Sequence, residues 1–344
     1  MWLLTALDMK YRAIRFVVVT IGTALVFTLL FLMTGLIEQF NQEPFLAVRQ
    51  VSTDDWAVPE GSSGPFTSSQ VLRVDQVGAL GAKGSVVVAR GTTVIDGVAS
   101  EGIIIGLGDE TFASLPLDAG RPPAGELEAV VDETTGLAIG DEFQLGGSSF
   151  SVVGLTTDTT LLAGQPAVFA RIFDARSVMF EGSPVTMAVL VEPGTSTDVA
   201  GTVVLTADDV AEDLLGPLES AVSSIDLIRI LLWVVAAIII GAVVYLSALE
   251  RQRDFAVLLA IGGRSRQLAG SLAIQAVFVA LLAVGTAAAL QAVVAPVFPL
   301  KVRVPASSLW QLPTVAIVVA LLAASAAMRR VRKTDPAAAF GGPA

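Results

Sequence analysis

Cysteine and histidine are both absent from this chain of 344 residues. Their absence excludes disulfides, thiol nucleophiles, Ser-His-Asp triads and zinc sites built from the usual ligands. A Walker A loop ends in Gly-Lys followed by Ser or Thr. Lys333 is the one lysine that precedes Ser or Thr, and Arg332 stands before it instead of glycine. The chain therefore lacks a P-loop, and we expect no catalytic activity, metal or cofactor of its own.

Positive charge is scarce as well, with 21 Lys and Arg against 32 Asp and Glu and a net charge of −11. Nucleic acid is not an expected partner, because neutralising phosphates requires a concentrated basic surface. Apolar residues are abundant instead. They make up 53% of the chain against 15% charged residues, and the mean hydropathy is +0.73. This composition predicts a membrane protein.

Four segments are long and apolar enough to cross a bilayer, which requires about 20 apolar residues in a helix. The expected spans are residues 16–37, 225–249, 268–294 and 310–328. The first span is interpreted as an uncleaved anchor, because it is too long for a signal peptide and no Ala-x-Ala cleavage site follows it. Residues 1–15 are expected to form an interfacial helix, and residues 295–309 a short outer loop.

The orientation follows from the basic residues of the short segments, since an excess of Lys and Arg marks the cytoplasmic side. These residues lie before the first span, between the second and third, and after the fourth: Lys10, Arg12, Arg15, Arg251, Arg253, Arg264, Arg266, Arg329, Arg330, Arg332 and Lys333. The three segments alternate onto one side. We therefore expect both termini, the tail 329–344 and the loop 250–267 in the cytoplasm, and residues 38–224 outside.

Residues 38–224 have the composition of a soluble α+β domain inserted between the first two spans, rich in glycine, aspartate and short β-branched runs. Strands are expected at residues 85–89, 102–105, 128–131, 142–145, 150–153 and 186–191. Gly146-Gly147 predicts a hairpin turn, and residues 132–137 a short helix. Residues 208–223 are expected to lead helically into the second span.

Two other patterns in the chain each allow a purely structural interpretation and a functional one. Neighbouring carboxylates occur at Asp54/Asp55, Asp208/Asp209 and Glu212/Asp213. Adjacent side chains diverge, so a solvated surface is favoured over an acid/base site, which needs convergent groups.

Alanines of the third span also recur at helical spacing: Ala273, Ala276, Ala280, Ala283 and Ala287. A face of small residues can bring helices together in lipid, but alanine is abundant throughout this chain.

The loop 250–267 is the most informative segment, because it predicts a short amphipathic helix outside the membrane. Phe255, Leu258, Leu259 and Gly262 share one face, and Gly262-Gly263 forms a natural helix stop. The apolar face must be covered. The lipid interface could cover it, or a groove on a cytoplasmic partner could do so.

The loop resembles the signature Glu-Arg-x-x-Glu-Phe-Ala-x-Leu-x-Ala-Ile-Gly-Ala of the FtsX-like permeases, which include the MacB, LolC/LolE and DevC-type subunits of ABC transporters. The matching residues are Glu250, Arg251, Phe255, Ala256, Leu258, Ala260, Ile261 and Gly262. Asp254 and Gly263 replace the usual Glu and Ala. The tail 332–340 is similar to the family ending Arg-x-Asp-Pro-x-Glu-Ala-Leu, with Ala338 in place of Glu. Residues 120–158 resemble the β-rich insert of MacB-like periplasmic domains.

The resemblance implies a permease subunit in the bacterial cytoplasmic (inner) membrane that pairs with two copies of a cytoplasmic P-loop ABC ATPase, which binds ATP and Mg. A second permease copy is also implied, in a homodimer or a heterodimer, within membrane lipids. The implied ATPase-coupling residues are Glu250, Arg251, Arg253, Asp254, Phe255, Leu258, Leu259 and Gly262, and the implied tail contacts are Thr334, Asp335 and Pro336.

The resemblance also implies a mechanism, in which ATP hydrolysis moves the outer domain by mechanotransmission and so exports or extracts a substrate. The alternative is an FtsX-like signalling regulator that activates an extracytoplasmic cell-wall hydrolase. The MacB-like insert favours transport, since the division proteins carry a smaller outer domain without it. A passive membrane-anchored binding module would leave the coupling-helix signature unexplained.

Overall fold

The computed structural model describes residues 13–80, 84–95, 97–195, 198–250, 265–298 and 300–333. The chain divides into two compact units, Met1–Gln39 with Ser223–Ala344, and Phe40–Val222. We call them the helical unit and the inserted domain. The expected fold class, four membrane helices with an α+β domain between the first and second, is confirmed.

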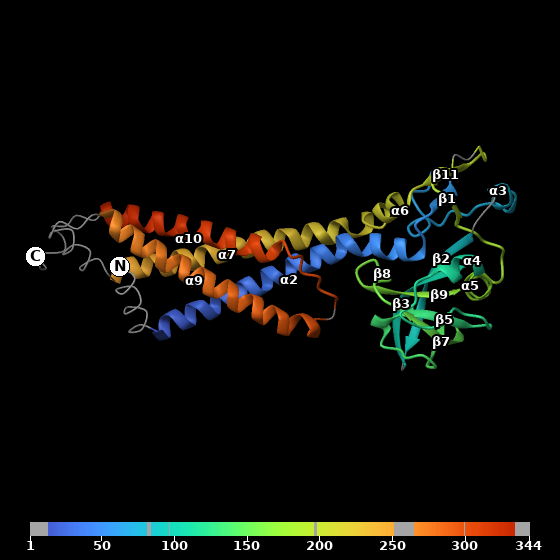
Figure 1. Cartoon of the computed structure of the whole chain (residues 1–344), viewed down its shortest axis with the longest axis horizontal. Coiled ribbons are helices and arrows are strands. Elements are labelled where there is room, and N and C mark those ends of the chain that lie inside the picture. The colour runs from blue at the N-terminus through green and yellow to red at the C-terminus, as the bar shows by residue number, and fades with distance from the viewer. Residues whose placement is uncertain are drawn as a thin grey trace, which may run out of the picture. The chain divides into compact units, whose positions relative to one another are not determined.

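Four long helices account for the helical unit (Figure 1). They are α2 (Ala13–Val51), α7 (Glu219–Glu250), α9 (Ser265–Val294) and α10 (Ser308–Lys333). Each is long and apolar enough to cross a membrane. The short η3 (Ala295–Val297) follows α9. Both α2 and α7 extend beyond their expected spans, and each continues across the division into the inserted domain.

One apolar core joins all four helices. Phe27 and Phe31 of α2 are fully buried in it, together with Ile240 of α7. Four of the five alanines noted on the third span, Ala276, Ala280, Ala283 and Ala287, are buried in the same core, and α9 packs directly against α10. Small side chains let helix backbones approach closely. This alanine face therefore packs inside the chain and is not free to meet a second copy.

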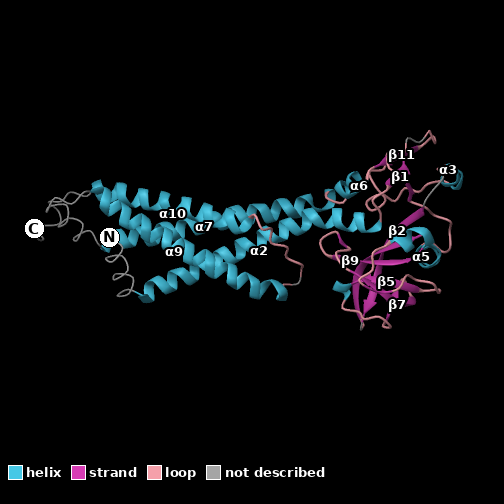
Figure 2. Cartoon of the chain, in the orientation of Figure 1, coloured by secondary structure: helices cyan, strands magenta, loops and turns pink. Residues whose placement is uncertain are grey.

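The inserted domain is built on a sheet of 11 strands, drawn in magenta in Figure 2. The strands are β1 (Asp55–Pro59), β2 (Gly84–Ile95), β3 (Val98–Leu107), β4 (Ala119–Gly120), β5 (Glu128–Asp132), β6 (Glu142–Leu145), β7 (Ser148–Thr156), β8 (Thr160–Leu161), β9 (Gln165–Arg171), β10 (Ala188–Val191) and β11 (Thr202–Leu205). The helical elements are α3 (Val74–Ala79), α4 (Asp109–Ser114), η1 (Glu133–Thr135), α5 (Ile172–Met179), α6 (Ala207–Asp213) and η2 (Gly216–Leu218).

Six of these strands close into a barrel in the order β2-β3-β9-β5-β7-β6, because β6 pairs with both β7 and β2. The pairs β3–β9 and β5–β7 are parallel, and the other pairs of the ring are antiparallel. Closure removes exposed strand edges. Strands β10, β1 and β11 continue the sheet from the beginning of β2.

Local sequence explains several of these elements. Valines of β2 and isoleucines of β3, such as Val87 and Ile104, are buried in the core. The predicted hairpin joins β6 to β7, with Leu145 opposite Ser148 and both intervening glycines at positive φ, as a two-residue hairpin turn requires. The helix expected at residues 132–137 is shorter than predicted. It is the single 3₁₀ turn η1, which ends at the left-handed Gly136.

Candidate functional site

The loop expected to couple this chain to a partner lies largely outside the described residues. Glu250 is the last residue of α7, and the description resumes at Ser265 in α9. Arg251, Arg253, Asp254, Phe255, Leu258, Leu259 and Gly262 fall between them, and Thr334, Asp335 and Pro336 follow the end of α10. Figure 1 places the beginnings of α2 and α9 and the end of α10 at one end of the helical bundle.

A polar pair lies near that end, between α7 and α9. Ser247 and Gln275 are both buried, and Nε2 of Gln275 lies 3.4 Å from Oγ of Ser247. Oε1 of Gln275 finds no partner among the described residues. Val244 and Leu272 are among the apolar side chains that surround the pair. This pair was not predicted from the sequence, although a glutamine within an uncharged apolar span is a visible signal.

The end of α2 and the beginning of α7 lie in the inserted domain. Two polar contacts attach this part of α2 to the rest of that domain. Oε1 of Glu43 accepts a hydrogen bond from the backbone nitrogen of Gly164 at 2.8 Å, in the turn between β8 and β9. Nη2 of Arg49, in the last turn of α2, lies 2.8 Å from Oδ1 of Asp208 in α6. Because α6 and η2 lead directly into α7, the Arg49–Asp208 pair links α2 to the segment from which α7 begins.

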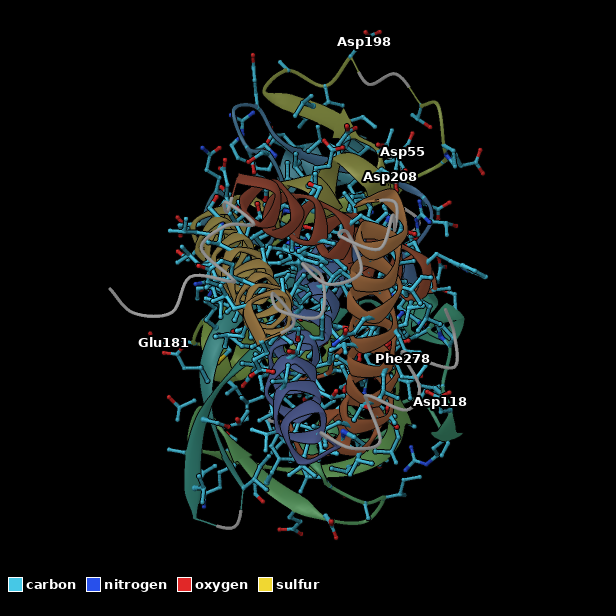
Figure 3. The ribbon with its side chains drawn as sticks, turned by 90° about the vertical axis from the view of Figure 1, so that its left-hand side faces the viewer. Asp55, Asp118, Glu181, Asp198, Asp208 and Phe278 are labelled. Carbon is cyan, nitrogen blue, oxygen red and sulfur yellow. The ribbon has the colours of Figure 1, made fainter. Side chains whose placement is uncertain are left out.

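The neighbouring carboxylates do not form an acid/base site. Asp208 pairs with Arg49, whereas Asp209 caps the first turn of α6 together with Thr206. Asp213 accepts hydrogen bonds from the hydroxyls of Ser63 and Thr67. Other acids of the domain, such as Asp118, Glu181 and Asp198, are exposed at its surface (Figure 3). The predicted solvated surface agrees with the exposure of Asp208, Asp209 and Glu212, whereas Asp54, Asp55 and Asp213 are half-buried.

Asp132 is a fully buried carboxylate in the segment that resembles the MacB-like insert. Its Oδ1 accepts hydrogen bonds from the backbone and hydroxyl of Thr134, and its Oδ2 accepts two more from Thr159 at 2.8 and 2.7 Å. Four donors saturate the carboxylate. Asp132 therefore joins the end of β5 to the β8 region. Among the described residues there is no group of three His, Cys, Asp or Glu that could hold a metal.

A second carboxylate of this segment is paired with arginine. Arg121 contacts Glu128 through both terminal nitrogens, at 2.8 and 2.6 Å, and the backbone nitrogens of Ala124 and Gly125 also donate to Glu128. The Arg121 guanidinium, aided by these backbone donors, lowers the pKa of Glu128 to about 2. The contact fastens the loop after β4 to the beginning of β5.

The fold defines a multi-pass membrane protein whose first two spans carry a mixed α/β barrel domain. The profile of the FtsX-like permease C-terminal family matches residues 227–336. The ABC transporter permease Rv2563 of Mycobacterium tuberculosis is 36% identical over 342 residues, which cover 98% of each chain. A second permease of that organism, Rv0072, is 35% identical over 350 residues, with the same coverage.

Solved structures are also similar to part of the chain. The periplasmic region of MacB from Actinobacillus actinomycetemcomitans is 12% identical and aligns with a TM-score of 0.36. The alignment covers 49% of this chain and 96% of that one.

This chain belongs to the FtsX-like family of ABC transporter permeases. It is the permease subunit of an ABC transporter, and membership in this family implies an ATPase partner.

Proposed function

We propose that this permease converts ATP hydrolysis by a separate cytoplasmic ATPase into movement of its inserted domain, and thereby exports or extracts a substrate. The loop 250–267 would form the coupling helix, with Phe255, Leu258 and Leu259 seated in a groove of the ATPase and Thr334, Asp335 and Pro336 adding a tail contact. The working complex would contain two permease copies and two ATPases, in a bacterial cytoplasmic membrane.

The observation that carries this proposal is the continuity of α2 and α7. Each is a single helix that begins or ends inside the inserted domain and crosses the helical unit. A helix transmits displacement along its axis, because its backbone hydrogen bonds make it stiff. Pro44 removes one of these bonds from α2 without ending the helix. The contacts Glu43–Gly164 and Arg49–Asp208 attach the domain side of α2 to the turn between β8 and β9 and to α6, which leads through η2 into α7.

The orientation is part of the proposal. The inserted domain would be extracytoplasmic, and both termini and the loop 250–267 would be cytoplasmic. The distribution of basic residues supports this orientation, as does the gathering of three helix ends at one end of the bundle (Figure 1). The long uncharged stretches of the spans favour mechanical transmission over a polar channel through the bilayer.

The test is co-purification of the ATPase with wild-type permease and with Phe255→Asp. A charge placed in a desolvated contact should weaken binding roughly tenfold or more, and permease-dependent ATP hydrolysis should fall with it. Phe173→Asp is the matched control, because Phe173 is 67% exposed in the inserted domain. Equal binding by all three proteins would reject the coupling assignment and would favour a loop that lies in the lipid interface.

A further inference from the structure

A hollow of about 340 Å³ lies within the helical unit, between α2, α7 and α10. Its polar lining consists of Thr34, Arg229, Ser308 and Gln311. Its volume lies within the range of small-molecule sites. The hollow lies late in the membrane segment of α2 and at the beginning of α10, since it is lined by Thr34 and Ser308.

Polarity changes along the hollow. Both α7 and α10 start at the same end of the bundle (Figure 1). On α10 the polar Ser308 and Gln311 come first, and Leu312, Val315 and Val319 follow. The eleven helical steps from Ser308 to Val319 correspond to about 16 Å of helix. The hollow is therefore polar at one end and apolar toward the middle of the bundle.

Two groups at the polar end can form further hydrogen bonds. Ser308 is 1% exposed, yet its Oγ finds no hydrogen-bond partner among the described residues. Arg229 forms an ion pair with Asp226 one turn earlier on α7, through Nη2. A guanidinium has five N–H donors in a planar fork, so an Arg229 that is paired through one nitrogen can still bind an oxyanion.

The depth of the hollow matches the lipid–water interface. Trp310 is 79% exposed in the first turn of α10, and tryptophan is enriched at the level of lipid headgroups. Val315 is 39% exposed, so the apolar end is open at the side of the bundle. A ligand seated here could keep its chain in the bilayer while its head reaches Arg229.

We propose that the hollow binds the head of an anionic amphiphile, a phosphate or carboxylate attached to an acyl chain. The oxyanion would lie beside Arg229, Ser308 and Gln311, and the chain would run past Leu312, Val315 and Val319 into the bilayer. The amphiphile is either a resident membrane lipid or cargo of the transporter, and both sources present the same chemistry. The site is formed by the helical unit alone, so the test of this proposal is independent of the coupling-helix proposal.

The test measures binding of two probes to the full-length permease in complex with its ATPase. Dioctanoyl phosphatidylglycerol carries the phosphate, and dioctanoylglycerol has the same chains without it. The wild-type complex should bind the phospholipid at least tenfold more tightly. Arg229→Gln should remove most of this preference, and Val315→Phe should weaken both probes by filling the apolar end. Lys301→Gln removes an exposed cation that does not line the hollow and should change neither affinity.

Folding is controlled separately, because Arg229→Gln leaves Asp226 without its cation. The double variant Asp226→Asn/Arg229→Gln has no unpaired charge, and it should bind ATPase normally while still losing the phosphate preference. Release of bound phospholipid on addition of ATP would identify the amphiphile as cargo, whereas retention would identify a resident lipid. Equal affinity of the wild-type complex for both probes would overturn the proposal, as would an equal loss from Lys301→Gln and Arg229→Gln.

Discussion

Glu43 in helix α2 accepts a hydrogen bond from the backbone nitrogen of Gly164, in the turn that connects β8 to β9. The turn is conformationally strained, since Leu162 and Ala163 have φ values of 50° and 71°, a left-handed region that non-glycine residues seldom occupy. Such a conformation persists only where its surroundings hold it. The Glu43 carboxylate therefore fastens a strained turn of the inserted domain to the helix that continues into the helical unit.

Replacing Glu43 by alanine should release this turn. The Gly164 amide is half-buried and would lose its acceptor, and an unsatisfied donor costs about 1–3 kcal/mol when it is fully buried and less when water can reach it. Hydrogen exchange of the Gly164 amide in the full-length protein should accelerate accordingly. Glu43→Gln keeps an acceptor of the same shape and should have a smaller effect, while Glu60→Ala removes an exposed carboxylate and should have none. Unchanged exchange in Glu43→Ala would contradict the assignment.

The Arg121–Glu128 contact predicts a specific pH dependence. The pKa of Glu128 is lowered to about 2 in the folded protein from an ordinary value of 4.5. The ionised carboxylate therefore contributes stability that is fully present above pH 4.5 and is lost as the pH falls toward 2. Glu128→Gln should lower the unfolding temperature at pH 6. The difference in unfolding temperature between this variant and the wild type should shrink as the pH falls from 4.5 to 3. A difference that stays constant over this range would argue against the ion pair as the cause.

The proposed orientation can be tested by labelling single cysteines, because the native chain has none. Ser69 and Ser183 are exposed in the inserted domain, so Ser69→Cys and Ser183→Cys should react with an impermeant maleimide in intact cells. Ser265→Cys, at the other end of the bundle, should react only after the membrane is opened. Labelling of Ser265→Cys in intact cells, with protection of the other two, would reverse the topology.

Hydropathy predicted the four membrane helices but not how far the first one continues. Beyond residue 37 the chain turns polar, with Glu38, Gln39, Gln42 and Glu43, so hydropathy indicates the end of a membrane span there. The helix nevertheless runs to Val51, because Ala47, Val48 and Val51 are buried in the core of the inserted domain. Burial in the membrane stabilises the first part of this helix, and burial in the inserted domain stabilises the last part. A hydropathy pattern indicates only the part that is buried in the membrane.

The candidate sites also differ in whether the sequence alone indicates them. The amphipathic pattern around Phe255 was visible in the sequence, since it depends on residues three and four apart. The Ser247–Gln275 pair and the hollow around Arg229 were not. They bring together residues from helices that are distant in the chain, and no local period encodes which helices become neighbours.

The sequence by itself determined the number of spans, the position of the inserted domain and the turn between β6 and β7, because each depends on local composition or on two consecutive glycines. Only the tertiary structure decided that the sheet closes, through pairs such as Thr93 with Leu145, and that Ser308 lines the same hollow as Arg229. Contacts of this kind form between segments far apart in the chain. Their free energy depends on how whole surfaces fit together, which no single segment specifies.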